Sequence, residues 1–296
     1  MIPRTSGTIL WEPENVGAQK AAQDLGEEIY WNATGREDDI DGQIALVDRV
    51  VSGNYKGLVL APDHFLALIT PVRRALAKGM PTVIVGSPLP IPANDNLSYV
   101  LNDEQEGGRL AAERVAQLVP GTGSVALTGI NPDIAAIMLR ARSFEQALAV
   151  YAPGARVIVR RMGTFNVAHE QEGADDLLRE NPHVDVIVTL TAASTRAAIS
   201  VIEGTRASSP TKVVGFDPEA LPFESKSLDS MIVQNTRGMG DQAIRMIHAR
   251  AQGEPVPHRV LFKPLLVTRE NFGSTTAMLL ERWQPGGSTL KWAVSP

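Results

Sequence analysis

The sequence predicts an α/β fold with parallel sheets, and two patterns carry this prediction. Short apolar runs alternate with longer segments of helical apolar spacing along nearly all of the 296 residues. The runs at 57–61 (GLVLA) and 81–85 (PTVIV) are apolar throughout and do not alternate with polar residues. Such strands are typical of parallel sheets that helices cover on both faces.

The first half of the chain begins with a helix that we expect to end at Gly26, because a loose apolar stripe stops there and glycine commonly follows a helix. The remaining elements follow from the same alternation. Predicted strands are 28–33, 57–61, 81–85 and 97–101, and predicted helices are 41–52, 65–78 and 105–119.

The second half repeats the pattern with strands at 124–128, 156–160, 184–189, 212–216 and 228–234, and helices at 134–150, 168–180, 193–203 and 238–251. The pattern of residues 259–268 predicts a strand pair or one long bent strand. Pro264 cannot donate to a sheet ladder, so it suits a crossing between two sheets. A last helix is expected at 272–283.

The start of the chain leaves two interpretations open. Either Met1 to Pro3 is the end of a first strand and Thr8 to Trp11 is a loop, or Thr8 to Trp11 is itself the strand. In the second case Trp11 belongs to the core.

Composition excludes several classes of function. The chain has 28 Lys plus Arg against 33 Asp plus Glu, a net charge of -5 and no basic tract, which argues against nucleic acid or anionic membrane as a partner. It has no cysteine, so disulfides, thiolate catalysis and cysteine-based zinc sites are excluded. No apolar run approaches the roughly 18 residues that a membrane helix needs.

Sequence motifs of catalysis are also missing. Asp63-His64 has no second histidine four residues on, and the five histidines are scattered. The 121–124 segment (GTGS) lacks the lysine of a phosphate loop, and there is no GxSxG elbow. An α/β protein of this size without those motifs is expected to bind rather than transform, with no cofactor and no metal.

Two polar side chains stand where predicted strands end. The run at 213–216 stops at Asp217, and the run at 231–233 stops at Gln234. Because the carboxyl ends of parallel strands face the ligand crevice, both are candidate ligand groups. The alternative is that Asp217-Pro218 is only a turn or a helix cap.

Five segments in order resemble the type I periplasmic solute-binding proteins, in the sugar-binding branch typified by ribose-binding proteins, which shares its core with lac-repressor-like effector domains. The segments are IPRTSGTILWEPENVGAQKAAQDLG, YVLNDEQEGGRLAAERV, LRARSFEQAL, VVGFDPEAL and IVQNTRGMGDQAI. The resemblance implies two Rossmann-like α/β lobes joined by three crossings. It places the lobes at 1–102 plus 236–263 and at 104–234 plus 265–296, with the ligand held between them by hinge closure.

The resemblance also implies ligand-binding residues. Trp11 and Phe165 match the aromatic rings that stack on a sugar, and Asp217 and Gln234 match a carboxylate and an amide that bind hydroxyls. Weaker candidates are Ser87, Arg140, Thr191 and Thr8. We favour the loop interpretation of Thr8 to Trp11, because Trp11 then aligns without gaps to the helix that ends at Gly26. In that case residues of the first strand precede Met1.

Several positions depart from the family pattern. Leu10, Thr8 and Thr191 replace an aromatic and two asparagines, Gly86-Ser87 replaces an Asp-Arg pair, and Met138 replaces an arginine, although Arg140 is close by. The ligand is therefore expected to differ from ribose bound in the standard way.

The expected function is the solute-binding protein of an ABC-type importer for a sugar or related polyol, recognised by a membrane permease. It is expected to be a monomer in the periplasm or outside the cell, with any signal peptide ahead of Met1. The alternative is the ligand-sensing domain of a transcriptional regulator or membrane sensor kinase. No basic helix-turn-helix precedes the fold, which argues against a repressor. An enzyme has no support beyond Asp217.

Overall fold

The computed structural model describes residues 1–6, 9–205, 209–217 and 225–272, and the predicted helix at 272–283 lies almost wholly outside them. The chain forms two compact units. The first contains Met1–Asp103, Pro132–Ala136 and Asn235–Phe262, and the second contains Glu104–Asn131, Ile137–Gln234 and the chain from Lys263 on.

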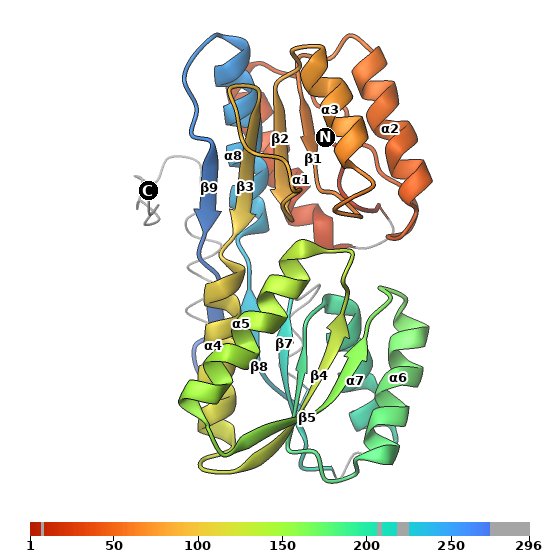
Figure 1. Ribbon diagram of the computed structural model, residues 1–296, viewed down its shortest axis with the longest axis vertical. Helices are drawn as coiled ribbons and strands as arrows, with labels where there is room; N and C mark the ends of the chain where they lie inside the picture. The colour runs from red at the N-terminus through yellow and green to blue at the C-terminus, as the bar shows by residue number, and fades with distance from the viewer. Residues whose placement is uncertain (7–8, 206–208, 218–224, 273–296) are drawn as a thin grey trace. The chain divides into compact units, whose positions relative to one another are not determined.

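The first unit is built on a four-stranded parallel sheet in the order β1-β2-β3-β9 (Figure 1). Its strands are β1 (Leu58–Leu60), β2 (Thr82–Gly86), β3 (Leu97–Asn102) and β9 (Arg259–Phe262). Ile2 adds a parallel bridge to Leu60 beyond β1. The segment around Ile2 therefore occupies the place of a first strand.

Two pairs of helices cover the faces of this sheet, namely α1 (Glu12–Leu25) with α8 (Thr236–Ala251), and α2 (Ile40–Ser52) with α3 (Ile69–Ala77). Val59 lies in one buried cluster with residues of α1 and α8, while Leu58 and Leu60 lie in another with residues of α2 and α3. Successive strand residues thus point to opposite faces, and both faces are buried. The sequence is apolar throughout these strands for that reason.

The contact between α1 and α8 depends on two glycines. A Cβ atom at Gly17 would lie 2.0 Å from the carbonyl oxygen of Arg237, and one at Gly240 would lie 2.0 Å from that of Glu14. Since no side chain fits in that space, the two helices approach each other backbone to backbone.

Two local predictions in this unit need correction. Residues 28–33 are not a strand; the segment runs beside the N-terminus with irregular hydrogen bonds, such as Asn32 N to Met1 O at 3.2 Å, and a single bridge between Thr5 and Thr34. Pro3 lacks the N–H that a regular ladder requires there. Ile9–Trp11 is a 3₁₀ helix, so the strand interpretation of 8–11 is wrong.

The second unit has a six-stranded sheet in the order β10-β8-β7-β6-β4-β5. All neighbours are parallel except β10 with β8. The strands are β4 (Gly123–Ile130), β5 (Ala155–Met162), β6 (Val186–Thr189), β7 (Lys212–Phe216), β8 (Leu228–Val233) and β10 (Leu265–Thr268). The predicted α/β class with parallel sheets is confirmed.

The helices of this unit are α4 (Glu104–Leu118), α5 (Ala135–Tyr151), α6 (Val167–Glu180) and α7 (Ala192–Thr205). A Cβ at Gly215 would meet Thr195 of α7, whereas the ring of the next residue, Phe216, lies against Gly107 of α4. Helices α4 and α7 therefore cover opposite faces of β7.

The chain passes from the first sheet to the second at Lys263-Pro264, because β9 pairs with β3 and β10 pairs with β8. The division into units differs from the predicted lobes at 132–136, which clusters with the first unit, and at Lys263, which clusters with the second. Among the described residues, no helix is long and apolar enough to cross a membrane.

Candidate ligand-binding site

The carboxyl edge of the second sheet carries three of the predicted site residues. Thr191 follows β6, Asp217 follows β7 and Gln234 follows β8. These strands are neighbours in the sheet. Their carboxyl ends therefore present the three side chains along one edge, which is where open α/β sheets bind ligands.

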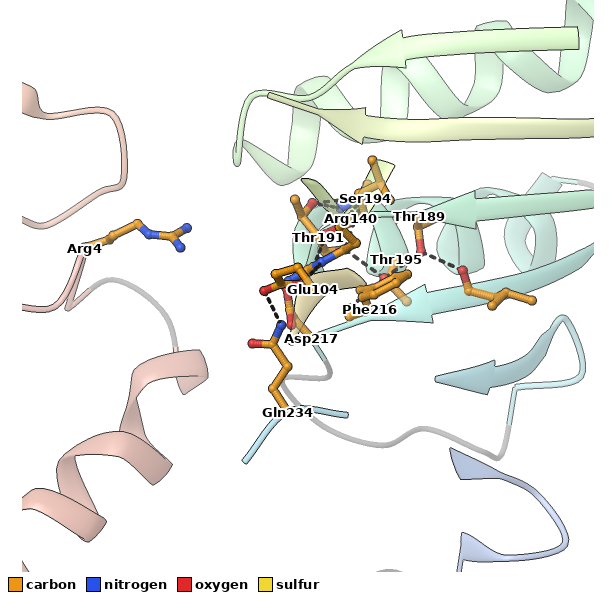
Figure 2. A network of polar contacts seen from close by, with 12 residues as sticks. Arg4, Glu104, Arg140, Thr189, Thr191, Ser194, Thr195, Phe216, Asp217 and Gln234 are labelled. Carbon is orange, nitrogen blue, oxygen red and sulfur yellow. Dashed lines mark hydrogen bonds and ion pairs between the residues drawn. The ribbon is translucent and has the colours of Figure 1, made fainter. Parts of the chain in front are cut away.

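Arg140 of α5 connects this edge into one network (Figure 2). Its Nε and Nη2 atoms donate to the two oxygens of Glu104, at 2.7 and 3.0 Å. Its Nη1 atom donates to Asp217 Oδ2 at 2.6 Å and to the carbonyl of Leu190 at 2.5 Å. Gln234 Nε2 donates to Glu104 Oε1 at 2.9 Å. The guanidinium is thus held in a fixed fork between two carboxylates.

Burial makes this network electrostatically strong. Arg140 is 3% exposed and Glu104 is 4% exposed, and the guanidinium carbon lies 4.4 Å from the ring centre of Phe216. Burial opposes the charge of Arg140, but Asp217 and Glu104 hold its pKa above the usual range. Burial likewise raises the pKa of Glu104, against the opposing effect of Arg140. The hydrogen bonds of Arg140 therefore hold the side chains of Glu104 and Asp217 in fixed positions.

Backbone conformation at two predicted site residues is unusual. Asp217 has a φ of 52° and Phe165 has a φ of 58°. Aspartate adopts this left-handed region comparatively often, whereas phenylalanine rarely does. Residues in such conformations persist only where the surrounding structure holds them, and they are common at ligand sites.

Thr191 caps the start of α7. Its Oγ1 accepts from Ser194 N at 3.2 Å and lies 2.8 Å from Ser194 Oγ, which in turn accepts from Thr191 N at 3.2 Å. This reciprocal pairing resembles a capping box. The hydroxyl of Thr191 therefore has a structural role in addition to any contact with a ligand.

The first unit has its own polar groups around Trp11. The indole Nε1 donates to Glu37 Oε1 at 3.3 Å, and the guanidinium carbon of Arg4 lies 5.1 Å from the centre of the indole ring. Arg4 Nη1 also lies 3.7 Å from Glu37 Oε2. With 7% of its surface exposed, Trp11 packs mainly into the core cluster beneath α1 and α8.

Two more residues stand at the carboxyl edge of the first sheet. Asp63 follows β1, and its backbone N–H donates to Gln43 Oε1 at 2.9 Å. Burial raises the pKa of Asp63 to about 8, while Arg4 acts in the opposite direction. Ser87 follows β2 and is buried. The preceding Gly86 has a φ of 73°, a backbone conformation that disfavours any side chain at this position.

The structure thus brings Asp217, Gln234 and Arg140 into one network and places Thr191 beside it. Phe165 lies in the loop between β5 and α6 of the same unit, whereas Trp11 and Ser87 belong to the first unit. Thr8 lies outside the described residues. Ligand contact by each of them stays a prediction.

Sequence reasoning missed Glu104, which binds both Arg140 and Gln234. It also assigned no role to Arg4, Glu37 or Asp63. Glu104 follows the end of β3 by two residues, so the argument applied to Asp217, a carboxylate after a buried strand, would have selected it.

Comparison with protein families decides the assignment. The model of the periplasmic binding protein domain matches residues 1–255. The chain belongs to this family. Both of its sheets, and the polar residues at their carboxyl edges, accord with that membership.

Two curated proteins and one crystal structure illustrate how this periplasmic binding protein domain relates to others. It is 22% identical over 270 residues to the D-allose-binding periplasmic protein of Escherichia coli, covering 87% of this chain and 86% of that one. It is 26% identical over 196 residues to the HTH-type transcriptional regulator CelR of Thermobifida fusca, covering 65% and 57%. A carbohydrate transporter solute-binding protein from Agrobacterium radiobacter, in complex with D-arabinose, matches with a TM-score of 0.86 at 24% identity, covering 94% and 96%. The structural match shows a shared fold.

Proposed function

We propose that this protein is the solute-binding component of an ABC-type importer and that it captures a sugar or sugar derivative. The observation that carries the proposal is the Arg140–Glu104–Asp217–Gln234 network at the carboxyl edge of the second sheet. Named ligands of similar proteins, D-allose and D-arabinose, are sugars.

The network suits hydroxyl groups. Asp217 keeps 17% of its side chain exposed, while its Oδ2 is held by Arg140. A carboxylate fixed in this way accepts a hydrogen bond from a sugar hydroxyl without having to reorganise, and charge-assisted bonds of this kind are strong. Gln234 supplies an amide with both a donor and an acceptor.

The other predicted site residues, which come from both units, would add apolar and polar contacts. Trp11 and Phe165 offer ring faces for the C–H side of a sugar, and Ser87, Thr191 and Thr8 offer hydroxyls. Arg4 and Asp63 extend this set beyond the residues that the sequence selected. Because Gly86-Ser87 and Met138 lack the charges of the family pattern, the preferred ligand is not ribose bound in the standard way.

The proposal also covers the location, the oligomeric state and the partners of the protein. The protein acts in the periplasm or outside the cell as a monomer, delivers its ligand unchanged to a membrane permease, and requires no cofactor, metal or nucleic acid. Hinge closure of the two units on the ligand would produce the form that the permease recognises.

A second candidate rests on the match to the transcriptional regulator CelR. In this case the same sugar-binding fold would serve as the sensing domain of a regulator. The full-length gene product separates the two candidates. A DNA-binding or kinase segment would identify a sensor, whereas a cleaved signal peptide would identify a transport protein.

A thermal-shift screen of the purified protein tests the proposal. Pentoses, hexoses, polyols, sugar acids, N-acetylated sugars and nucleosides are added at millimolar concentration. A ligand at 100 times its dissociation constant adds about 2.7 kcal/mol of stability, which raises Tm by several degrees. A rise confined to one sugar class supports the proposal, and a rise with nucleosides in place of sugars would overturn it.

A further inference from the structure

A pocket in the second unit lies between helices α6 and α7 and the carboxyl ends of β4 and β5. Its cavity volume is about 30 Å³, within about 390 Å³ of space free of protein atoms that includes open solvent. Its walls combine polar and apolar side chains, including Thr128, Arg161, Glu170, Leu177, Ile187 and Ala198.

Two polar atoms in these walls are left unpaired. Thr128 is 7% exposed, and its Oγ1 has no hydrogen-bond partner in the described part of the chain. The Nε of Arg161 is likewise buried and unpaired, although its Nη2 donates to Glu180 Oε2 at 2.6 Å. Folded proteins rarely leave such groups unpaired, because each costs about 1 to 3 kcal/mol. Their shared position in one pocket indicates a ligand group that accepts hydrogen bonds.

Glu170 adds a carboxyl group to the lining of the pocket. Glu170 is 7% exposed, and its Oε1 accepts from the backbone N–H of Thr164 at 2.8 Å. Burial raises its pKa. The pocket therefore offers donors at Thr128 and Arg161 and a carboxyl acceptor at Glu170, with the apolar side chains of Leu177, Ile187 and Ala198 completing the wall.

Two residues connect this pocket to the proposed sugar contacts. Thr164 lines the pocket and immediately precedes Phe165. Ser194 also lines it and is paired with Thr191 at 2.8 Å. The pocket thus adjoins two residues predicted to touch the sugar, and the inference that follows rests on the proposed function.

We propose that the pocket receives an acetamido substituent, so that the protein prefers an N-acetylated sugar. The amide carbonyl accepts from Thr128 and Arg161, the amide N–H donates to Glu170, and the methyl group packs against Leu177 and Ile187. A carboxylate would meet Glu170, and an ammonium would meet Arg161. A hydroxyl would leave the apolar part of the wall without contact.

Isothermal titration with matched sugars tests this proposal. The probes are N-acetylglucosamine, N-acetylgalactosamine and N-acetylmannosamine, each compared with its free amine and with the unsubstituted hexose. We expect one N-acetylated sugar to bind at least tenfold more tightly than its amine and its hexose.

Thr128→Val and Ser230→Ala form a matched pair of variants. Ser230 is fully buried on β8 of the same sheet, its hydroxyl is also unpaired among the described residues, and it lies outside the pocket lining. Removing either hydroxyl should leave Tm unchanged or raise it, since an unpaired buried group is lost. Only Thr128→Val should weaken binding of the N-acetylated sugar, by about tenfold, which is what one buried hydrogen bond contributes. Thr128→Ser should retain tight binding.

The outcomes separate this inference from the proposed function. Equal binding of a hexose and its N-acetylated form, or an unchanged affinity ratio in Thr128→Val, would overturn the acetamido pocket while leaving sugar binding intact. Binding of no sugar at all would overturn both.

Discussion

The Nη1 atom of Arg140 lies 2.6 Å from Oδ2 of Asp217, a residue held at a φ of 52° directly after β7. The ion pair fixes the carboxylate at the edge of the sheet, and the same guanidinium holds Glu104 on its other side. One buried arginine therefore determines where two carboxylates point, and its removal should affect both stability and binding.

Arg140→Met should destabilise the protein by about 3 to 5 kcal/mol, because it leaves the buried carboxyl of Glu104 without its ion pair. Adding Glu104→Gln to this variant should restore part of the loss. Urea unfolding measures both. Arg160→Met is the control, since Arg160 and Glu145 form an exposed pair of about 0 to 1 kcal/mol. Equal losses at 140 and 160 would contradict this account of the network.

Asp217→Ala should weaken sugar binding by about 1.5 to 3 kcal/mol, which is roughly 10- to 150-fold in Kd. Calorimetry with the ligand from the screen measures the change. Asp185→Ala serves as the matched control, because Asp185 precedes β6 at the opposite edge of the same sheet and binds Ser124. An unaltered Kd for Asp217→Ala would place the ligand site elsewhere.

Stability should fall with rising pH because of Glu14, which is 1% exposed and has two unpaired buried oxygens among the described residues. Burial raises its pKa from 4.5 to about 8, with Arg4 opposing. Between these two values the folded state binds more protons than the unfolded state, so the free energy of unfolding decreases as pH increases. The full loss is on the order of 5 kcal/mol.

Glu14→Gln should remove most of this loss, so that the variant exceeds the wild type in stability above pH 8. Urea midpoints at pH 5 and pH 8.5 measure the difference. The exposed Glu12→Gln on the same helix should retain the wild-type slope. A residual slope is expected from Asp63, whose pKa burial also raises to about 8. Parallel pH profiles for Glu14→Gln and the wild type would contradict the assignment.

Gly240→Ala should destabilise the first unit, because the added Cβ would lie 2.0 Å from the backbone oxygen of Glu14 and force α1 and α8 apart. We expect a loss of about 1 to 3 kcal/mol. Gly173→Ala in α6 has nothing within 4 Å of the new Cβ and should gain about 0.5 to 1 kcal/mol. Thermal unfolding of the two variants provides the comparison, and shifts of the same sign would refute the close-packing argument.

Much of the fold could be predicted from local pattern. Strands such as β2 and β7 were found within a residue because an apolar run between two helical stripes has few other interpretations. The segment 28–33 was misassigned because its apolar residues indicate a strand while its neighbour, Pro3, cannot complete the ladder. The sequence alone does not show which segment lies beside Pro3.

The candidate site was predictable in part. Asp217 and Gln234 were selected as candidates because a polar residue directly after an apolar run can be recognised in the sequence alone. Glu104 was missed although it follows the end of β3 by two residues, and Arg140 was placed only as a weaker candidate because it lies within α5 rather than after a strand.

The sequence itself determined the order of helices and strands, the α/β class and the positions of strand ends. Apolar periodicity and turn residues are local properties of the chain, so they can be recognised without the tertiary structure. Only the tertiary structure decided that Arg140 would bind Glu104, 36 residues earlier, and Asp217, 77 residues later. These contacts depend on the strand order β8-β7-β6 and on the packing of α4 and α5 against one face of the sheet. The partner of a buried charge depends on which distant segments pack together. The spacing of residues along the chain does not show this.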